Sequence, residues 1–406
     1  MKRYDCIIAG AGASGLVAGI TAARRGLNVC LLEHKNEVGK KILNTGNGKC
    51  NLTHVGVCPK DYPDEYGEIT AKVFEQFGYE KTLDFFKSIG IFTTERNGYV
   101  YPMSGTALSV RNALSDELKR LNADVFTGAD VKGITPGFCV DAVIEGKKVC
   151  FEGEKVILAA GSCASPVTGS DGSGYSLVEK LGVKIRKPLP ALVKLISGER
   201  SCKRASGVRA DCSIKLYVNG ELKAGDKGEL QFTDDGISGI PVFQISRYAA
   251  LALDEGKEAE AVIDTAPGMT LEELEEYFFY GRKKSEDRSL KNFLGGIMPS
   301  KLVTAVADKA SVSSDKKISD INDEKVREII HTIKEYRLKI IKTNGFDGAQ
   351  VCMGGVDLSE IDFDTMEHKR IKGLFFSGEI IDVDGPCGGY NLQWAWSSGA
   401  VAGMNV

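Results

Sequence analysis

The stretch Ala9-Gly10-Ala11-Gly12-Ala13-Ser14-Gly15 lies near the start of the 406-residue chain and contains the spacing G-x-G-x-x-G. The apolar run Tyr4 to Ala9 before it is typical of a buried strand, and Leu16 to Arg25 after it is typical of a helix. A second run, Asn28 to Leu32, predicts another strand, which leads into Glu33. This order of strand, glycine turn, helix and acid-terminated strand predicts a βαβ unit that binds a dinucleotide.

Each residue of this motif has a physical task. Gly10 permits the tight turn, Gly12 lets the backbone approach a pyrophosphate, and Gly15 lets the helix pack closely on the strand. The N-terminus of the helix offers unpaired N–H groups and a positive dipole end to the phosphates. Glu33 can accept hydrogen bonds from both hydroxyls of an adenosine ribose and would repel a 2′-phosphate.

Composition excludes several classes of protein. The net charge is −3, so the chain lacks the basic surface of a nucleic-acid-binding protein, and we expect no nucleic-acid partner. The eleven cysteines show no C-x-x-C pair, and the four histidines form no metal-like pair, so we expect neither a disulfide framework nor a metal site. Glycines interrupt the uncharged run Cys6 to Ala23, so we expect no membrane insertion and a cytoplasmic protein.

The order of strand-like and helix-like patterns predicts three parts. Strands and helices alternate through residues 1–190, short alternating strands fill 191–269, and helical spacing dominates 270–344. Residues 345–406 return to strand-like, glycine-rich sequence. We therefore expect a nucleotide-binding domain formed by 1–190 and 345–406, interrupted by a β-barrel-like domain and a helical subdomain.

Some individual elements are predicted within these parts. Phe126 to Val131 is typical of one strand, and the segments Phe138 to Ile144 and Lys147 to Glu152 predict a hairpin. Val326 to Ile341 shows helical spacing and predicts a single helix.

A second pair of glycines precedes a helix near the end of the chain. Gly373 to Phe376 predicts a strand, and Gly388-Gly389 leads into a helix predicted over Trp394 to Gly403. In a flavoprotein this arrangement would aim the N–H groups of about Asn391 and Leu392 at the N1 and C2 carbonyl region of the flavin, where charge develops on reduction.

The chain resembles a bacterial family of NAD(P)/FAD-dependent oxidoreductases that includes aminoacetone oxidase-like flavoproteins and a bile-acid dienone reductase of gut clostridia. Three segments carry the resemblance, which spans essentially the whole chain: Gly39 to Thr53, Gly228 to Pro241, and Gly354 to Trp396. The family more often has Gly, Arg and Asn where this chain has Asn47, Lys49 and His54. Lys49 cannot make the bidentate phosphate contact of an arginine.

The resemblance implies a glutathione-reductase-like α/β fold, with a Rossmann FAD domain and the inserted β-barrel plus helical domain, and non-covalent FAD. Lys41 and the turn Gly46-Asn47-Gly48 suit a cationic and N–H-rich shell around the pyrophosphate, and Val131 would meet the adenine through its backbone. Cys50 lacks a partner at the C-x-x-x-x-C spacing of disulfide reductases, so we expect it to pack. The full set of expected cofactor residues is Gly10, Gly12, Ala13, Ser14, Gly15, Glu33, Lys41, Gly46, Gly48, Asn51, Val131, Gly161, Gly378, Glu379, Gly389, Asn391 and Leu392.

No second G-x-G-x-x-G follows a predicted strand, so NADH or NADPH would reach the flavin through the substrate cavity. The first hypothesis for the reaction is hydride transfer from reduced flavin to a conjugated C=C bond of an enone, such as a 3-oxo bile-acid or steroid dienone. The alternatives are oxidation of a small amine by oxygen and a non-catalytic flavin-binding sensor. The oligomeric state stays open.

The sequence assigns no catalytic residue. Tyr390 is a candidate through its place in the last motif, with packing as the alternative role. An apolar cluster in the insertion is expected either to line a small-molecule substrate site or to form the core of the β-domain; it comprises Phe232, Ile237, Ile240, Pro241 and Phe243.

Overall fold

The computed structural model describes residues 3–135, 137–285 and 287–406. The chain divides into two compact units, one made of residues 1–189 and 350–406 and the other of residues 190–349. Each unit has a hydrophobic core of its own. No helix within the described residues is long and apolar enough to span a lipid bilayer.

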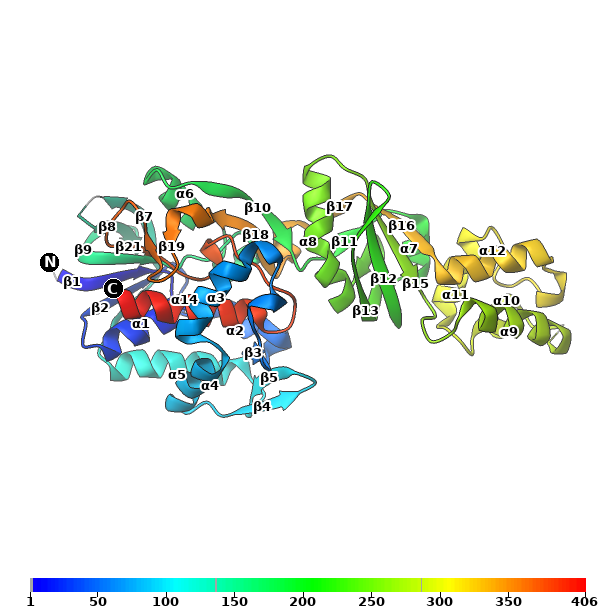
Figure 1. Cartoon of the computed structure of the whole chain (residues 1–406), viewed down its shortest axis with the longest axis horizontal. Helices are drawn as coiled ribbons and strands as arrows, with labels where there is room; N and C mark the ends of the chain where they lie inside the picture. Colours follow the sequence, from blue (N-terminus) through cyan, green and yellow to red (C-terminus); the bar gives the residue numbers. More distant parts are fainter. Residues whose placement is uncertain (1–2, 136, 286) are drawn as a thin grey trace. The chain divides into compact units, whose positions relative to one another are not determined.

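A nine-stranded sheet forms the centre of the discontinuous unit (Figure 1). Its neighbouring strands β21-β9-β1-β2-β6 pair in parallel, as a nucleotide-binding sheet requires. β7 and β8 add an antiparallel arm beside the first half of β9, and β19 and β20 extend the opposite edge. The strands are β1 (Arg3–Ala9), β2 (Val29–Glu33), β6 (Asp124–Thr127), β7 (Ala129–Thr135), β8 (Cys139–Ile144), β9 (Lys147–Leu158), β19 (Ile361–Asp362), β20 (Glu367–His368) and β21 (Leu374–Phe376).

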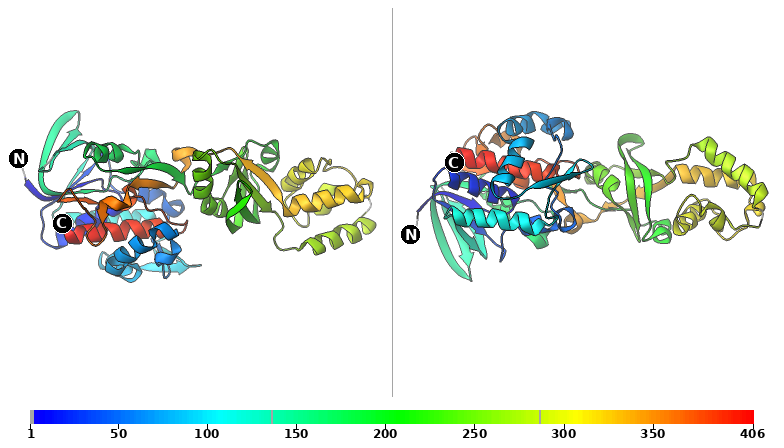
Figure 2. Two further views of the ribbon diagram at one scale, coloured as in Figure 1. Left: turned by 45° about the horizontal axis from the view of Figure 1, so that its top comes forward. Right: turned by 90° about the horizontal axis from the view of Figure 1, so that it is seen from below.

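Three helices lie side by side against this sheet, with α1 between α14 and α5 (Figure 2). Gly399 and Gly403 of α14 make the close approach to α1 possible. A Cβ atom on Gly399 would lie 2.4 Å from the carbonyl oxygen of Ser14, and one on Gly403 would lie 2.5 Å from that of Ala18. The three helices are α1 (Ala13–Arg24), α5 (Ala107–Arg120) and α14 (Tyr390–Asn405).

Shorter elements complete the unit. The sheets β3-β5-β4 and β10-β18 are separate from the central sheet, although β18 is linked to the segment after β21 by a bridge between Val356 and Ile381. These elements are α2 (Lys40–Asn44), β3 (Thr53–His54), α3 (Gly67–Phe77), α4 (Tyr79–Ser88), β4 (Thr93–Arg96), β5 (Tyr99–Pro102), α6 (Ser173–Lys180), β10 (Ile185–Ala191) and β18 (Val351–Val356).

The unit of residues 190–349 contains a seven-stranded sheet in the order β16-β15-β12-β13-β14-β11-β17, covered by α8. The strands at the two ends of this order, β16 and β17, are separated in the chain by Ile341 alone, whose N–H donates to the carbonyl of Ile196 in β11. One bent segment therefore borders both ends and closes the sheet into a barrel-like ring. The elements are β11 (Leu195–Ile196), α7 (Arg200–Ala205), β12 (Arg209–Val218), β13 (Glu221–Thr233), β14 (Gly236–Ser238), α8 (Ile240–Asp254), β15 (Ala259–Asp264), β16 (Tyr336–Ile340), β17 (Lys342–Thr343) and α13 (Gly345–Gly348).

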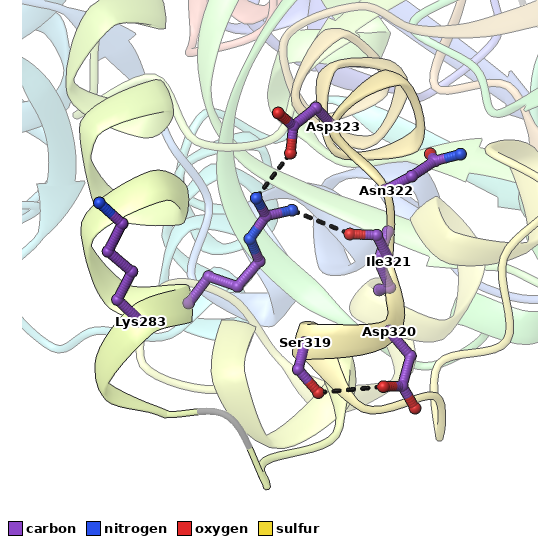
Figure 3. A pocket seen from close by; sticks show the side chains of 7 residues that line it. Lys283, Ser319, Asp320, Ile321, Asn322 and Asp323 are labelled. Carbon is purple, nitrogen blue, oxygen red and sulfur yellow. Dashed lines mark hydrogen bonds and ion pairs between the residues drawn. The ribbon is translucent and has the colours of Figure 1, made fainter.

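Helices α9 (Leu271–Lys284), α10 (Leu290–Leu294), α11 (Ser300–Lys309) and α12 (Asp323–Lys334) form the rest of this unit. A polar pocket of about 670 Å³ lies between the end of α9 and the start of α12 (Figure 3). Its central guanidinium, that of Arg282, donates to the Asp323 carboxylate and to the carbonyl of Ile321, so the pocket holds no unpaired arginine.

Two predicted elements differ from the structure. The strand predicted over Phe126 to Val131 is broken at Gly128, whose φ of 67° turns the chain from β6 into β7. The helix predicted over Val326 to Ile341 ends at Lys334, and Tyr336–Ile340 forms β16 instead. Its residues alternate between buried and exposed positions, which is the period of a strand.

The hairpin predicted around Glu145-Gly146 is confirmed as β8 and β9. The sequence led us to expect no disulfide framework, and the structure contains one disulfide among the described residues, between Cys139 and Cys150 across this hairpin. Among the described residues, the single group with metal-ligand spacing is this pair with Asp141, and its two sulfurs are bonded to each other.

Candidate active site at the carboxyl edge of the parallel sheet

The carboxyl ends of the parallel strands bring the predicted glycine motif together with three other chain segments. The turn after β1 packs against the end of β9, because a Cβ on Gly10 would lie 2.4 Å from the carbonyl oxygen of Ala159. A Cβ on Gly15 would lie 2.0 Å from the carbonyl oxygen of Gly10, so both positions require glycine. A Cβ on Gly12 would meet no described atom within 4 Å, and this open side leaves room for a ligand.

Glu33 ends β2 beside this turn, and the residue is 8 % exposed. One carboxylate oxygen accepts the N–H of Ala11 at 3.0 Å, and the other accepts the N–H of Lys35 at 2.9 Å. A carboxylate has about four acceptor positions, so two remain for ligand hydroxyls. Glu33 therefore holds the glycine turn and keeps acceptor capacity at the same edge.

The segment after α2 forms a left-handed turn next to a buried, unpaired amide oxygen. Gly46 and Asn47 have φ values of 55° and 54°, and Cys50 has a φ of 58°. The side-chain oxygen of Asn51 is buried and has no hydrogen-bond partner among the described residues. Burial raises the pKa of the Cys50 thiol to about 12, so a reactive thiolate is disfavoured and Cys50 packs.

Lys41 and Glu379, both expected at the cofactor, form an ion pair. The ammonium of Lys41 donates to one Glu379 oxygen at 2.6 Å, and the other oxygen accepts the N–H of Cys352 at 3.0 Å. The two side chains are 27 % and 18 % exposed, so each is still accessible from one side. The sequence predicted both residues, but it did not predict their contact.

Gly378 follows β21 and is tied to both long helices. Its φ is 75°, and a Cβ there would lie 2.3 Å from the hydroxyl of Ser14 in α1. Its N–H donates to the Ser398 hydroxyl, and its carbonyl accepts the indole N–H of Trp394 in α14. The starts of α1 and α14 are therefore held at the same strand ends.

The loop before α14 is fixed mainly by glycines and one amide. A Cβ on Gly389 would lie 2.6 Å from the carbonyl carbon of Thr53, and one on Gly388 would lie 2.8 Å from the Tyr99 ring. The Asn391 side chain exchanges two hydrogen bonds with the backbone of Gly385, at 2.9 and 2.8 Å. The side chain of Asn391 thus fixes the loop. The backbone N–H groups of Asn391 and Leu392 lie in the first turn of α14, where no carbonyl within the helix is available to accept them.

An aromatic cluster, which we define as His54, Tyr62, Tyr99 and Tyr390, surrounds the start of α14. His54 and Tyr390 stack with ring centroids 5.1 Å apart and an interplanar angle of 16°. Tyr62 meets Tyr390 edge-on at 6.2 Å, and its hydroxyl donates to the Tyr390 carbonyl at 2.7 Å. The aromatic cluster was not predicted as a unit, since its members are distant in the sequence.

A fully buried polar network fixes the strand that carries His54. The hydroxyl of Thr53 donates to the Gln393 amide oxygen at 2.6 Å, and the Gln393 amide nitrogen donates to Thr82 and Ser397. Each of these side chains is buried and paired, so the network gives β3 a single position on α14.

The remaining predicted residues lie on neighbouring elements. Val131 is in β7, which contacts β2, the strand that ends on Glu33. Gly161 follows β9 with a φ of 73°, and a Cβ there would lie 2.9 Å from the Ser170 hydroxyl. Ala13 opens α1 directly after Gly12.

The residues present fit an FAD molecule. An open glycine turn at a helix N-terminus suits a pyrophosphate, a buried acid at the end of β2 suits a ribose, and the orphaned amide oxygen of Asn51 needs a donor. The two helix N-termini at one sheet edge supply N–H groups for anionic ligand atoms at two points.

Comparison of the amino-acid sequence with known proteins identifies the family of this chain. Residues 4–405 match the family described as the HI0933-like protein Rossmann domain. The chain is 42 % identical to a 3-dehydro-bile acid delta(4,6)-reductase of Clostridium scindens, over 99 % of this chain and 98 % of the relative. It is 30 % identical to a ribosomal RNA dihydrouridine synthase of Escherichia coli, over 98 % of this chain and 96 % of the relative.

A solved structure shares the fold. A 3-ketosteroid-delta4-(5alpha)-dehydrogenase of Rhodococcus jostii RHA1 in complex with 4-androstene-3,17-dione superposes with a TM-score of 0.55 at 16 % identity, covering 99 % of this chain and 96 % of that one. The mixed α/β fold and the FAD expected from the sequence are confirmed. The chain belongs to the HI0933-like Rossmann family and is an FAD-dependent oxidoreductase.

Proposed function

We propose that this enzyme reduces a C=C bond conjugated to a carbonyl group in a 3-oxo bile acid or steroid dienone. The observation that carries the proposal is the 42 % identity, along nearly the whole of both chains, to a reductase named for that substrate class. The site adds physical support, since a helix N-terminus and aromatic side chains suit a planar, largely apolar ring system with one polar end.

Individual residues would hold the cofactor in defined ways. Gly10, Gly12 and Gly15 would admit the pyrophosphate to the N-terminus of α1, and Glu33 would bind the adenosine ribose. The Lys41 ammonium would screen phosphate charge on the side that Glu379 does not cover. We propose the same cofactor role for Ala13, Ser14, Gly46, Gly48, Asn51, Val131, Gly161, Gly378, Gly389, Asn391 and Leu392.

When bound and reduced, FAD supplies the hydride. The first-turn N–H groups of α14 would stabilise negative charge at the site before the hydride leaves. We propose NADH or NADPH as the donor that restores the reduced state, a small molecule rather than nucleic acid as substrate, and the cytoplasm as the location. We also propose that residues 1–190 and 345–406 form the FAD domain, 191–269 the inserted barrel and 270–344 a helical subdomain.

The apolar cluster that could line a substrate site or form the core of the β-domain contains both buried and exposed residues. Phe232 and Ile237 are fully buried in the core of the β-unit, which supports the core alternative for these two residues. Ile240, at the first turn of α8, is 46 % exposed and Phe243 is half-buried.

A second candidate substrate is a uridine in ribosomal RNA, favoured by the 30 % identity to a dihydrouridine synthase. The chemistry is the same, because dihydrouridine forms by adding two hydrogens across a C=C bond conjugated to a carbonyl. The net charge of −3 weighs against RNA, since phosphate contacts need a basic surface.

The test is anaerobic turnover by the purified holoenzyme with NADH or NADPH. A 3-oxo-4,6-dienone steroid and ribosomal RNA lacking dihydrouridine are offered separately at equal enzyme concentration. The proposal expects loss of the dienone absorbance and no dihydrouridine in the RNA. If dihydrouridine forms while the dienone is not reduced, the substrate is RNA rather than a steroid. If the enzyme reduces neither compound, the proposal of conjugated-bond reduction is overturned.

A further inference from the structure

Tyr390 lies at the N-terminus of α14, the helix end that we propose faces the flavin, and its hydroxyl is not used in a hydrogen bond among the described residues. Tyr390 is the first residue of α14, directly before the N–H groups of Asn391 and Leu392. Its side chain is half-buried, and its hydroxyl has no hydrogen-bond partner among the described residues. The other tyrosine that packs on it, Tyr62, uses its own hydroxyl to hold the Tyr390 backbone.

The ring of Tyr390 is held from several sides. His54 covers one face at 5.1 Å, and Tyr62 packs edge-on. A Cβ on Gly385 would lie 3.0 Å from the Cβ of Tyr390, and one on Gly388 would lie 3.4 Å from its ring. A hydroxyl on a ring held in this way has little freedom to lose on binding a ligand, which is the condition for effective preorganised donation.

Tyr390 also stays protonated at neutral pH. Burial is the main cause, with the negative charge of Asp61 adding to it, and the pKa of the phenol is raised to about 12. The group therefore acts as a hydrogen-bond donor rather than as a base throughout the physiological range.

We propose that Tyr390 donates its phenolic hydrogen to the carbonyl oxygen of the conjugated substrate, and that His54 positions the ring for this contact. The inference rests on the proposed function and deepens it. As the hydride adds to the far carbon of the conjugated system, the electron pair moves to the carbonyl oxygen and gives an enolate. Tyr390 stabilises that oxygen, and water protonates the adjacent carbon, so one hydride and one proton complete the reduction.

His54 supports one face of the Tyr390 ring by stacking, with the ring centroids 5.1 Å apart and an interplanar angle of 16°. We therefore assign His54 as a positioning residue that holds the Tyr390 ring.

Three holoenzyme variants test the contact, each checked for FAD content and melting temperature. Tyr390→Phe removes only the hydroxyl, His54→Ala removes the stack but keeps the hydroxyl, and Tyr79→Phe is the matched control on α4. The first readout is kcat/KM for the 3-oxo-4,6-dienone. The second is the infrared carbonyl stretch of 4-androstene-3,17-dione, ¹³C-labelled at its conjugated carbonyl and bound to oxidised holoenzyme, because a hydrogen bond lowers that frequency independently of turnover.

Tyr390→Phe should lower kcat/KM on the order of 100-fold, as expected for loss of one donor to a developing oxyanion, and should raise the carbonyl frequency. His54→Ala should lower kcat/KM by less than Tyr390→Phe does and should raise the carbonyl frequency, because the hydroxyl remains but is less well oriented. Tyr79→Phe should stay within about threefold of the wild type with an unchanged frequency, judged against the 100-fold effect of a lost donor. If Tyr390→Phe does not fold, 3-fluorotyrosine in place of Tyr390 serves instead, and its stronger donor should lower the frequency further.

An unchanged carbonyl frequency in Tyr390→Phe, together with near-wild-type kcat/KM and full FAD content, would overturn this assignment while leaving the proposed function intact. A wild-type enzyme that neither binds nor reduces either enone would overturn both together. A His54→Ala variant with wild-type kcat/KM and an unchanged carbonyl frequency would remove the positioning role of the stack.

Discussion

Removing the charge of Glu33 should weaken FAD binding by an amount that the structure allows us to bound. Glu33→Gln keeps the side-chain shape but leaves one acceptor oxygen where the carboxylate has two. In the structure both oxygens are occupied, by the N–H groups of Ala11 and Lys35 at 3.0 and 2.9 Å. The amide nitrogen of glutamine would face one of these donors, so the variant loses acceptor capacity for the ribose.

The magnitude follows from the energy of a charge-assisted hydrogen bond. Losing one such bond in a buried site costs about 1.5–3 kcal/mol, which corresponds to a rise of about 10- to 160-fold in the dissociation constant of FAD. Glu33 is only 8 % exposed, so water cannot replace the lost contact well. The glycine turn should loosen as well, which lowers the melting temperature of the apoprotein.

The assay is titration of apoprotein with FAD, followed by quenching of flavin fluorescence. Glu37→Gln is the control, because Glu37 follows the same strand but is 41 % exposed and pairs with Arg111. An FAD analogue lacking the adenosine 2′-hydroxyl completes a double-mutant cycle with Glu33→Gln. Equal dissociation constants for wild type and Glu33→Gln, or full additivity in the cycle, would refute the ribose contact.

Three further predictions concern stability, packing and electron donation. Hydrogen bonds from Arg120 and Arg24 lower the pKa of Glu117 from 4.5 to about 2, so its ion pairs stabilise the fold above pH 4.5 and lose this effect as the pH falls toward 2. Glu117→Gln should therefore cost about 2 kcal/mol in chemical denaturation at pH 7 and little at pH 2; a difference that persists at pH 2 would contradict the pairing. Gly399→Ala would put a methyl group 2.4 Å from the Ser14 carbonyl oxygen, which should cost about 1–3 kcal/mol in packing. The melting temperature and the FAD content should therefore fall together. An unchanged melting temperature would show that α1 and α14 are less closely packed. Anaerobic mixing of the holoenzyme with NADH or NADPH should bleach the flavin absorbance, whereas inertness to both would show that another donor reduces the flavin.

Local sequence patterns predicted much of the nucleotide-binding unit because its determinants are close together in the chain. The glycine turn, the helix after it and Glu33 occur within one βαβ segment, and steric limits at Gly10 and Gly15 explain why that spacing is required. The same local reasoning was wrong at Tyr336–Ile340, because the helical spacing before it was extended too far. These five residues instead alternate between buried and exposed positions and form a strand of the barrel-like ring.

The contacts that shape the site are long-range, and no sequence pattern encodes them. Lys41 and Glu379 are far apart in the chain, and so are Thr53 and Gln393, yet each pair is in direct hydrogen-bond contact. The stacking of His54 on Tyr390 belongs to the same class. Motifs therefore predict local features such as the glycine turn, whereas long-range contacts such as these emerge only from the fold.

The central claim is reduction of a conjugated C=C bond, and a single-turnover experiment tests it without the natural electron donor. Holoenzyme reduced with dithionite, with excess reductant removed, is mixed anaerobically with one equivalent of a 3-oxo-4,6-dienone steroid. The account predicts that the oxidised flavin spectrum returns as the dienone absorbance disappears, at one rate and in a one-to-one ratio. A flavin that stays reduced in the presence of the dienone, but reoxidises when oxygen is admitted, would contradict the account.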